Sequence, residues 1–403
     1  MNKLDDTYPE KSQFFRLPWS KNDNPIGWLE VTDTCNIYCK GCYRQRLTGH
    51  KSLDEIKEEI RLFKKWRNCD NISISGGEPL THPDIAEVVA SCVEHRMKPI
   101  LLTNAVLLDK DRLKDLKAAG LTGLTIHIDS LQDRPKWKGK TEEELNELRM
   151  HFAELAHEVG PFFCSFNSTV YHETVDSIPV IMKWANQHLD KVHSIIFITY
   201  RGVPIRDDLE YLSGDKSVEV ENALSYTESD MDTIDITSVN VYNILKGHVP
   251  FYDASGYLGG TATHDSYKWF IGVLLGTKDR PLGSFGRKGM EVVQAGHHLF
   301  QGTYPAYPLT NKAGRKIFLL SLFDKKIRET FGRYLKNPAN LVNNVYLQSI
   351  GIIQAPDLTS VHGQDMCDSC PDITWYDGQM VNSCRMDEYR KFGGFIQFAD
   401  KDE

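Results

Sequence analysis

Two patterns of apolar and polar residues alternate over the first half of the chain. Short apolar or β-branched runs are typical of buried strands, and they occupy residues 28–31, 71–75, 99–103, 123–128, 162–170 and 193–199. Between these runs, apolar residues recur every three or four positions, as they do on one face of a helix. The stretches with this second pattern are 52–66, 84–95, 109–119, 142–159 and 174–189. The pattern predicts that strands and helices alternate from Gly27 to Arg201.

The stretch after Ser52 carries the clearest helix signals. Ser52 and Glu55 have the spacing of a capping box, in which each side chain bonds the backbone N–H of the other residue. The apolar stripe that follows consists of Ile56, Ile60, Phe63 and Trp66. Gly120 stands where a helix C-cap is expected after 109–119. Six strand–helix units with short connections predict a parallel sheet covered by helices, and right-handed crossovers curl such a sheet toward a barrel.

This regularity is lost after about residue 205. Residues 206–235 are acidic and loop-like, and residues 250–316 are rich in Gly, Pro, Tyr and His. Helical character returns at 316–334 and again at 340–347. We expect this half of the chain to close the open side of the barrel and to shape a substrate pocket, but its pattern predicts no particular fold.

Composition narrows the class of protein. With 403 residues the chain has room for one large α/β domain with an appended part, or for two domains. The net charge of −8 and the lack of a basic stripe give no reason to expect nucleic acid as a partner. No apolar run is long enough to predict a membrane span, and the start lacks the apolar core of a signal peptide. The nine cysteines therefore predict a cytoplasmic protein, because clustered cysteines in that reducing compartment more often bind metal than form disulfides.

Cys35, Cys39 and Cys42 follow the first predicted strand in a C-x3-C-x2-C run. Three thiolates at this spacing can hold three irons of a four-iron cluster, and the fourth iron then has no protein ligand. An open iron can take a small chelating molecule, which turns an electron-transfer cluster into a catalyst. The triplet therefore predicts a catalytic iron–sulfur site.

Two other interpretations of the triplet stay open on the residues alone. Spacings of four and three also place side chains on one face of a helix, where three thiols would simply be part of a core. Asn36 and Gly41 argue against a regular helix at this point. A structural zinc ion would need a fourth ligand, and His50 is the obvious local candidate.

The second predicted strand is followed directly by Gly76-Gly77-Glu78-Pro79. Two glycines let the backbone turn sharply and approach a ligand closely. The Glu78 carboxylate can accept from an ammonium group, and Pro79 stiffens the exit. Any βα loop can carry two glycines, but this turn lies one strand after the cysteine loop. In βα barrels the reactive groups sit on loops at the carboxyl ends of strands, and both motifs have that position.

With these two motifs, the chain from about Trp28 to Arg201 resembles the radical S-adenosylmethionine (SAM) superfamily. The resemblance implies an α/β fold, namely a partial (βα)6 radical SAM barrel with an irregular α+β C-terminal extension. It also implies a [4Fe-4S] cluster on Cys35, Cys39 and Cys42, whose open iron is chelated by the amino and carboxylate groups of SAM. In such enzymes an electron from a flavodoxin- or ferredoxin-type donor cleaves the sulfonium. The product is a 5′-deoxyadenosyl radical, which abstracts hydrogen from the substrate.

The resemblance implies further SAM contacts. The turn Gly76–Glu78 is similar to the family's GGEP motif, which binds the amino group of SAM. Polar residues at later strand ends stand where the family places ribose and carboxylate contacts, namely Thr103, Asn104, Asp129, Ser130, Asn167 and Thr169. Asp129 is the expected ribose partner, because a carboxylate accepts from sugar hydroxyls. The alternative for each position is a cap on the following helix or turn. His127 is interpreted as a packed histidine of its strand.

One position departs from the family pattern. Many relatives carry an aromatic residue just before the third cysteine, where it lies along the adenine, and this chain has Gly41 there. Tyr38 and Tyr43 flank the site and are the candidates for that packing. The departure concerns the adenine contact and leaves the cluster prediction unchanged.

A second cysteine group lies near the C-terminus. Cys367 and Cys370 form a Cys-x2-Cys pair, and Cys384 follows fourteen positions later. This spacing is typical of a metal knuckle. The resemblance favours a second iron–sulfur cluster, because many family members carry auxiliary clusters in C-terminal extensions; a zinc knuckle and buried free thiols are the alternatives. The fourth ligand would be a substrate atom or one of His362, Cys69, Cys92 and Cys164. The default interpretation of the last three is core.

These signals divide the chain into four parts. They are an N-terminal extension (1–25), the partial barrel (26–205), a substrate-pocket and closing region (206–360) and the C-terminal cysteine segment (361–403).

The substrate is less defined than the reaction type. No cobalamin-binding domain precedes the cysteine loop, which argues against cobalamin-dependent methylation. The cysteine loop and the Gly-Gly turn are together similar to family members that act on hopanoid and other lipids. Apolar islands at 269–275 and 292–300 are candidate walls for a lipid or other apolar small molecule, and plain core is their alternative interpretation. Peripheral membrane contact is compatible with such a substrate.

Two other functions stay open. One is modification of a peptide or protein side chain. The other is a non-catalytic iron–sulfur electron carrier, against which the Gly76–Pro79 turn argues, because a carrier needs no loop that binds an amino acid.

Overall fold

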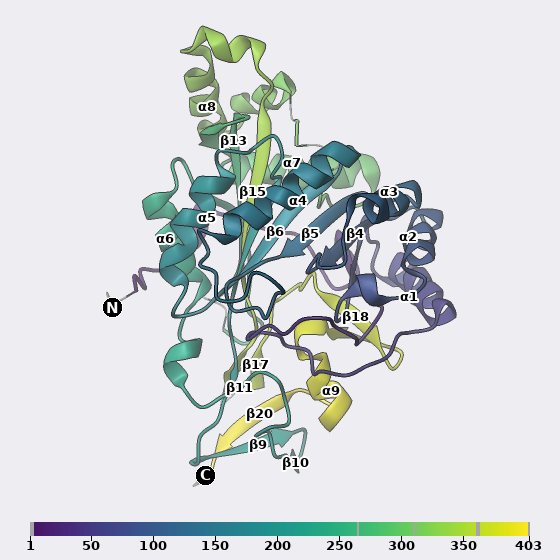
Figure 1. Ribbon diagram of the computed structural model, residues 1–403. Helices are drawn as coiled ribbons and strands as arrows, with labels where there is room; N and C mark the ends of the chain where they lie inside the picture. The colour runs from purple at the N-terminus through teal and green to yellow at the C-terminus, as the bar shows by residue number, and fades with distance from the viewer. Residues whose placement is uncertain (1–3, 264–265, 309–310, 313, 360–362, 402–403) are drawn as a thin grey trace.

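The fold is built on one central sheet of eleven strands (Figure 1). The computed structural model describes residues 4–263, 266–308, 311–312, 314–359 and 363–401. Neighbouring strands of the sheet follow the order β1-β12-β13-β15-β7-β6-β5-β4-β3-β2, and β14 pairs with β13. The predicted α/β class is confirmed.

The parallel half of the sheet contains the six strands that the sequence predicts. All six run parallel to their neighbours. They are β2 (Ile26–Glu30), β3 (Asn71–Ser75), β4 (Lys98–Thr103), β5 (Gly123–His127), β6 (Phe163–Val170) and β7 (Ser194–Thr199). Because both faces of this sheet are covered, the sequences of its strands are continuous apolar runs and do not alternate between apolar and polar residues.

Helices connect these strands as predicted. They are α1 (Leu53–Trp66), α2 (Ile85–Glu94), α3 (Lys110–Ala118), α4 (Leu145–Val159) and α5 (Ile178–Ala185). The capping box of Ser52 and Glu55 is present, and Gly120 follows α3 with a φ of 107°. Trp66 is wrong as a member of the buried stripe, because it ends α1 with 48% of its surface exposed.

The second half of the chain extends the same sheet instead of forming only irregular structure. Its long strands are β12 (Ala254–Gly259), β13 (Tyr267–Thr277), β14 (Arg280–Ser284) and β15 (Tyr346–Gln354). Strand β15 pairs in parallel with β7, and β13 then pairs with β15 in antiparallel fashion. The helix expected at 340–347 is wrong, because a 3-10 helix ends at Val342 and β15 begins at Tyr346.

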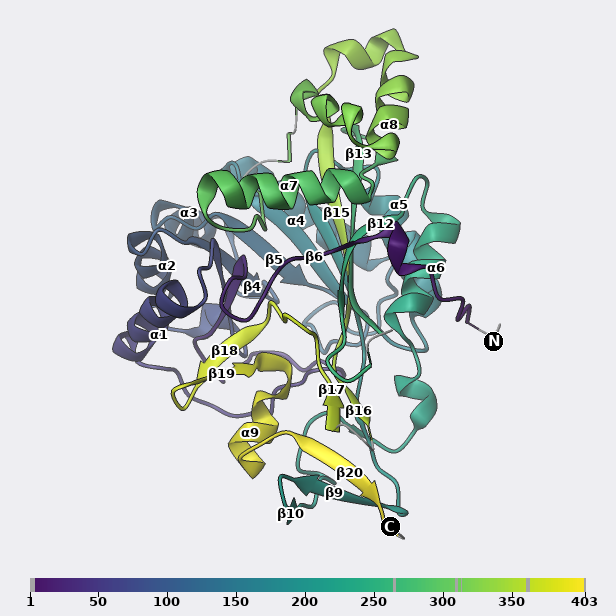
Figure 2. The ribbon, with the colours of Figure 1, turned by 180° about the vertical axis from the view of Figure 1, so that it is seen from behind.

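Three longer helices accompany these strands: α6 (Ser238–His248), α7 (Arg287–Gln301) and α8 (Lys325–Leu335). Figure 1 shows α4 and α5 on one side of the sheet, and Figure 2 shows α7 crossing the other side. The 3-10 helices are η1 (Lys11–Gln13), η2 (Pro79–Thr81), η3 (Val175–Ser177), η4 (Met231–Ile234), η5 (Arg315–Leu322), η6 (Pro338–Val342) and η7 (Ser383–Arg385).

Short strands and one helix complete the structure, and the first of these strands lies at the edge of the central sheet beside β12. They are β1 (Phe15–Arg16), β8 (Val203–Pro204), β9 (Leu209–Ser213), β10 (Lys216–Ser217), β11 (Thr227–Glu228), β16 (Asp357–Thr359), β17 (Gly363–Asp365), β18 (Ile373–Tyr376), β19 (Gln379–Asn382), α9 (Met386–Phe392) and β20 (Ile396–Asp400). The pairing of β20 with β9 ties the end of the chain to its middle.

Candidate active site

All six cysteines singled out in the sequence line one cavity of about 210 Å³. Cys35, Cys39 and Cys42 come from the loop after β2. The C-terminal group, Cys367, Cys370 and Cys384, comes from the segments after β17 and from η7. The parallel strands contribute the cavity wall through residues such as Thr125 and Asn167. The site therefore lies where a βα barrel places its reactive groups.

The loop with the first cysteine triplet is not helical. Cys39 forms an isolated bridge with Gln132, the Lys40 N–H donates to the carbonyl of Leu131 at 3.0 Å, and the Asp133 N–H donates to the carbonyl of Tyr38 at 2.7 Å. The interpretation of the triplet as the core face of a helix is therefore wrong. The loop is held by backbone bonds to the segment after β5.

The electrostatics of the first triplet suit a cationic group. Burial raises the pKa of the Cys39 thiol, and the nearby charges of Asp129, Cys42 and Cys35 raise it further. Burial likewise raises the pKa of Cys35 and Cys42. Thiolates are the form that binds iron, so a positive cluster is the partner that would stabilise them here. The donor set therefore fits an iron–sulfur cluster.

The spacing of the donors also bears on which metal they suit. Within the described ranges, no three His, Cys, Asp or Glu side chains are placed to hold a single metal ion. A four-iron cluster takes each thiolate at a different iron, so its ligands do not have to converge on one point.

His50, the candidate fourth ligand of a zinc site, lies elsewhere. Its Nδ1 is 2.8 Å from the hydroxyl of Thr32, and its ring makes an edge contact with His82. It lines a separate, polar cavity together with Lys51 and Arg390.

The two glycines after β3 bring their turn against the cysteine loop. A Cβ on Gly76, whose φ is 130°, would lie 2.3 Å from the Thr32 carbonyl oxygen, and one on Gly77 would lie 2.4 Å from that of Thr34. The Gly77 N–H donates to the Thr32 carbonyl at 2.7 Å. Both glycines also line the cavity. The sequence predicted a close approach to a ligand, and the structure adds a close approach to the loop of Cys35.

Glu78 is not among the residues of the cavity wall. Its exposed fraction is 0%. One carboxylate oxygen accepts from the Leu80 N–H at 3.0 Å and from the Thr103 hydroxyl at 2.6 Å, and the other accepts from the Asn104 N–H at 2.7 Å. Burial raises the pKa of this carboxyl group. Glu78 thus holds the end of β4, and through it the side chain of Asn104.

Asn104 and Asn167 both line the cavity. The Asn104 amide donates to the side-chain oxygen of Asn36 at 2.7 Å and lies 3.9 Å from the sulfur of Cys35. The side-chain oxygen of Asn167 is buried and has no hydrogen-bond partner among the described residues. Buried polar atoms normally have partners, so this oxygen points to a ligand that donates a hydrogen bond.

Tyr38, Asp129 and Ser130 are not among the residues of the cavity wall. Tyr38 is exposed and packs against the guanidinium of Arg46. One oxygen of Asp129 accepts from the Leu131 N–H at 2.9 Å, as the capping alternative expects. The Ser130 N–H donates to Glu142.

His127 is not a packed strand histidine, since it lines the cavity. Its Nε2 lies 3.0 Å from the Thr169 hydroxyl and 3.0 Å from a carboxylate oxygen of Asp129. The strand pattern alone did not distinguish it, because a residue at the very end of a strand can face either the core or the site.

Tyr171 fills the space beside Gly41. Its hydroxyl accepts from the Gly41 N–H at 2.8 Å, and a Cβ on Gly41 would lie 2.7 Å from the same oxygen. Of the two tyrosines named from the sequence, Tyr43 lines the cavity and Tyr38 does not. Tyr171 was missed in the sequence, because it lies 130 residues from Gly41 along the chain.

Residues next to the first strands of the barrel hold the backbone of the second cysteine group through hydrogen bonds. The guanidinium of Arg67, which is fully buried, donates to the carbonyls of Cys370 at 2.6 Å and Pro371 at 3.0 Å. The Asn24 amide donates to the carbonyl of Ser369 at 3.1 Å. Cys370 is thereby fixed against the start of the barrel.

The three cysteines named as candidate fourth ligands do not join this group. Cys69, Cys92 and Cys164 are buried in the main hydrophobic core, as their default interpretation expects. His362 lies outside the described residues.

Asp372 is a cavity residue that sequence reasoning missed. Burial raises its pKa to about 7. The only signal was its place two residues after Cys370. Other polar atoms of the cavity wall are buried without a partner among the described residues, and they belong to Thr125, Thr199, Trp269 and Ser383.

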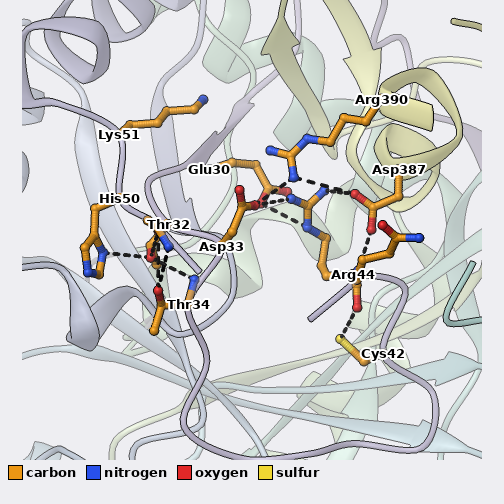
Figure 3. A network of polar contacts seen from close by, with 12 residues as sticks. Glu30, Thr32, Asp33, Thr34, Cys42, Arg44, His50, Lys51, Asp387 and Arg390 are labelled. Carbon is orange, nitrogen blue, oxygen red and sulfur yellow. Dashed lines mark hydrogen bonds and ion pairs between the residues drawn. The ribbon is translucent and has the colours of Figure 1, made fainter. Parts of the chain in front are cut away.

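A buried ion network joins the two cysteine-bearing segments (Figure 3). Arg44, two residues after Cys42, lies 2.7 Å from a carboxylate oxygen of Asp33, 3.2 Å from Asp387 and 3.7 Å from Glu30. Asp387 belongs to α9, which begins two residues after Cys384. Arg390, one turn later, contacts Asp33 at 2.8 Å. The loop of the first triplet and the helix after the last cysteine are thus coupled by charge.

The apolar islands named from the sequence contribute little to the cavity. Trp269 lines it, but most of β13 is covered within the sheet. None of residues 292–300 is in the wall; they lie on α7, where Leu299 and Phe300 are exposed. The expectation that this second island lines the pocket is wrong, because α7 packs on β12 and β1.

Comparisons with known proteins agree with this geometry. Residues 29–185 match the model of the Radical SAM superfamily. A probable GTP 3′,8-cyclase of Methanococcus maripaludis is 30% identical over 188 residues, which are 45% of this chain and 60% of that protein. The Fe-coproporphyrin III synthase of Methanosarcina barkeri is 30% identical over 128 residues, 30% of this chain and 32% of that protein. The chain spans 61% or less of the length of these curated relatives.

Among solved structures, Streptococcus suis SuiB matches with a TM-score of 0.41 and 16% identity, over 58% of this chain and 49% of that chain. Residues 29–185, which match the Radical SAM superfamily model, contain most of the six parallel strands and the cysteine loop, so the match covers the part of the chain in which the sequence predicted the resemblance.

Proposed function

We propose that the protein binds a [4Fe-4S] cluster through Cys35, Cys39 and Cys42 and uses it to cleave SAM reductively. The cluster and SAM together would supply a 5′-deoxyadenosyl radical, which abstracts hydrogen from an organic substrate. The observation that carries this proposal is the meeting of both cysteine groups with the Gly76–Gly77 turn in one cavity. An electron carrier has no use for a cavity lined by polar atoms that lack partners.

The protein's own groups would bind and orient SAM. Gly76 and Gly77 line the cavity, and their backbone carbonyls would accept from the ammonium of SAM. Asn104, fixed by Glu78 and Asn36, and the unpartnered oxygen of Asn167 offer further polar contacts. Because these groups are already held by the fold, little ordering is left for the moment of binding.

Cys367, Cys370 and Cys384 would hold a second iron–sulfur cluster. A side-chain hydrogen bond with Cys370 and burial raise the pKa of Cys367, and burial and the nearby Cys370 raise the pKa of Cys384, so these thiols also suit a positive partner. A cluster here would face the same cavity as SAM and would exchange electrons with the substrate or bind it. A flavodoxin- or ferredoxin-type protein would supply the reducing electron.

The cavity wall favours a substrate that has both an apolar part and a hydrogen-bond donor. Trp28, Trp269 and Ile353 provide apolar surface, and Asp372 is an acidic residue of the same wall. This supports a small apolar organic molecule as the substrate, with lipids as one class. It also argues against a non-catalytic electron carrier, which would bind no substrate. GTP is a second candidate to test, because the relatives above include proteins named GTP 3′,8-cyclase.

Anaerobic turnover tests the proposal. The chain, reconstituted with iron and sulfide and given dithionite and SAM, should yield 5′-deoxyadenosine, detected by liquid chromatography. The triple variant Cys35→Ala, Cys39→Ala, Cys42→Ala should yield none. Cys92→Ala, which changes a core cysteine outside the cavity, is the matched control and should keep the activity. A wild-type protein that binds a cluster but forms no 5′-deoxyadenosine would be a carrier.

A further inference from the structure

A small helical unit projects from one end of the sheet, beyond β13 and β15 (Figures 1 and 2). It consists of η5, α8 and η6 and is called here the helical tip, residues 315–342. Phe318, Ile327 and Tyr334 are buried at its base against Leu275 and Phe285. The helical tip is therefore packed onto the sheet and is not a loose arm.

The outer surface of the helical tip is apolar to an unusual degree. Four large side chains, Leu319, Leu322, Phe323 and Val342, have exposed fractions between 63% and 87%. In a 3-10 helix, residues three apart lie on the same side, so Leu319 and Leu322 share one face of η5, and Phe323 follows at once. Exposed apolar groups gathered in this way mark a binding surface.

The charge of the helical tip is opposite to that of the whole chain. Residues 315–342 contain seven lysines and arginines and two acidic residues, whereas the chain as a whole has a net charge of −8. One of the two acids, Asp324, is buried and caps α8. Five of the basic side chains are exposed, namely Arg315, Lys316, Lys325, Arg328 and Lys336. The exposed surface thus combines apolar and positive groups.

We propose that the helical tip docks on the surface of a lipid bilayer that contains anionic lipids. Leu319, Leu322 and Phe323 would enter the boundary between headgroups and acyl chains, and the basic residues beside them would lie among the phosphates. No helix in the described part of the chain is long and apolar enough to cross a membrane, so this is attachment to one surface. The proposal is independent of the chemistry in the cavity.

A second copy of the chain fits the helical tip less well. In a two-fold dimer the same surface meets itself, so two strongly positive tips would face each other across an apolar contact. A bilayer with anionic headgroups neutralises that charge and accepts the apolar side chains at the same time. Charge complementarity therefore selects the lipid surface.

Vesicle binding tests the proposal with the reconstituted full chain. We expect it to sediment with phosphatidylcholine vesicles that contain about one third phosphatidylserine, and much less with phosphatidylcholine alone. Raising the salt from about 0.1 M to about 1 M should release most of it, because the Debye length falls roughly threefold. The double variant K316E/K325E should bind at least about tenfold more weakly, since each basic residue near the surface contributes roughly fivefold.

Apolar variants separate docking from non-specific adhesion. L322D/F323D should abolish vesicle binding. L299D/F300D is the matched control, because these α7 residues are as exposed (78% and 81%) but lie outside the helical tip; it should bind as the wild type does. Circular dichroism and 5′-deoxyadenosine formation confirm that each variant is folded. No binding to anionic vesicles, equal loss in the α7 control, or a dimer that only L322D/F323D dissolves would each overturn the proposal.

Discussion

Glu78 shows how a motif residue can act through its neighbours. Its carboxylate accepts three hydrogen bonds from Leu80, Thr103 and Asn104 inside the protein. In Glu78→Gln, an amide N–H₂ would replace one acceptor and face groups that are already donating. We expect the free energy of unfolding to fall by about 1–3 kcal/mol, measured by urea denaturation. SAM affinity, measured by calorimetry, should fall as well, because Asn104 loses its support.

The matched control for this prediction is Glu87→Gln on α2, where the glutamate is exposed. It should change neither quantity. If Glu78→Gln binds SAM more weakly but unfolds as the wild type does, then the carboxylate contacts the ligand directly and its three protein partners are incidental.

At the scale of residues, the sequence predicted those cavity residues that belong to a local motif or stand at the end of a predicted strand. The cysteines, the Gly76–Gly77 turn, Asn104 and Asn167 were all named from strand ends and spacing, and all line the cavity. Tyr171 and Asp372 were not, because their roles depend on neighbours that folding alone brings together. Tyr38 and Asp129 were named and lie outside the wall, since a residue's position at a strand end does not fix which way its side chain points.

At the scale of elements, His193 joins two central strands. Its N–H donates to the carbonyl of Cys164 at 2.8 Å, and its Nδ1 accepts from the Cys164 N–H at 3.2 Å. Burial lowers the pKa of His193 to about 4. An unfolded histidine titrates near 6.5, so between these values the native state binds fewer protons than the unfolded state. Stability present above about pH 6.5 is therefore lost as the pH falls toward 4.

We expect this loss to reach at most about 1.4 kcal/mol per pH unit, measured by urea unfolding across that range. His193→Gln should flatten the slope, while His151→Gln on the exposed face of α4 should not. An unchanged slope in His193→Gln would assign the acid sensitivity to other groups.

The ion network of Figure 3 couples elements that are far apart in the chain. Arg44 is buried and lies among the carboxylates of Glu30, Asp33 and Asp387. Removing it in Arg44→Met leaves uncompensated buried charges, and such a loss typically costs about 3–5 kcal/mol. Chemical denaturation should detect it. The matched control is Arg61→Met, whose partner Glu58 lies on the exposed face of α1; that variant should unfold almost as the wild type does.

Elements of the first half were predictable and those of the second half were not. The strands from β2 to β7 are buried apolar runs with helices between them, and local pattern describes both. Strands β12 to β14 contain glycines and are interrupted by bulges. Their sequences therefore lack the regular pattern of a strand and look like loops. The place of β15 beside β7 is a contact between residues about 150 positions apart, and no local pattern encodes it.

At the scale of the whole molecule, the question is whether both cysteine groups hold clusters. The two groups share one cavity, and Arg44 and Asp387 bind their segments together. We therefore expect the reconstituted protein to contain about eight irons and negligible zinc, which is the content of two four-iron clusters. Metal analysis of the purified chain measures both directly.

Two triple variants apportion this iron. Changing Cys35, Cys39 and Cys42 to alanine should remove about four irons and end SAM cleavage. Changing Cys367, Cys370 and Cys384 should also remove about four, but SAM cleavage should persist, because the first cluster and the Gly76–Gly77 turn are untouched. A zinc ion has no redox chemistry, so about four irons with one zinc in the wild type would make the C-terminal group a structural clip. In that case its only role would be to hold the segment of Asp372 and α9 over the cavity.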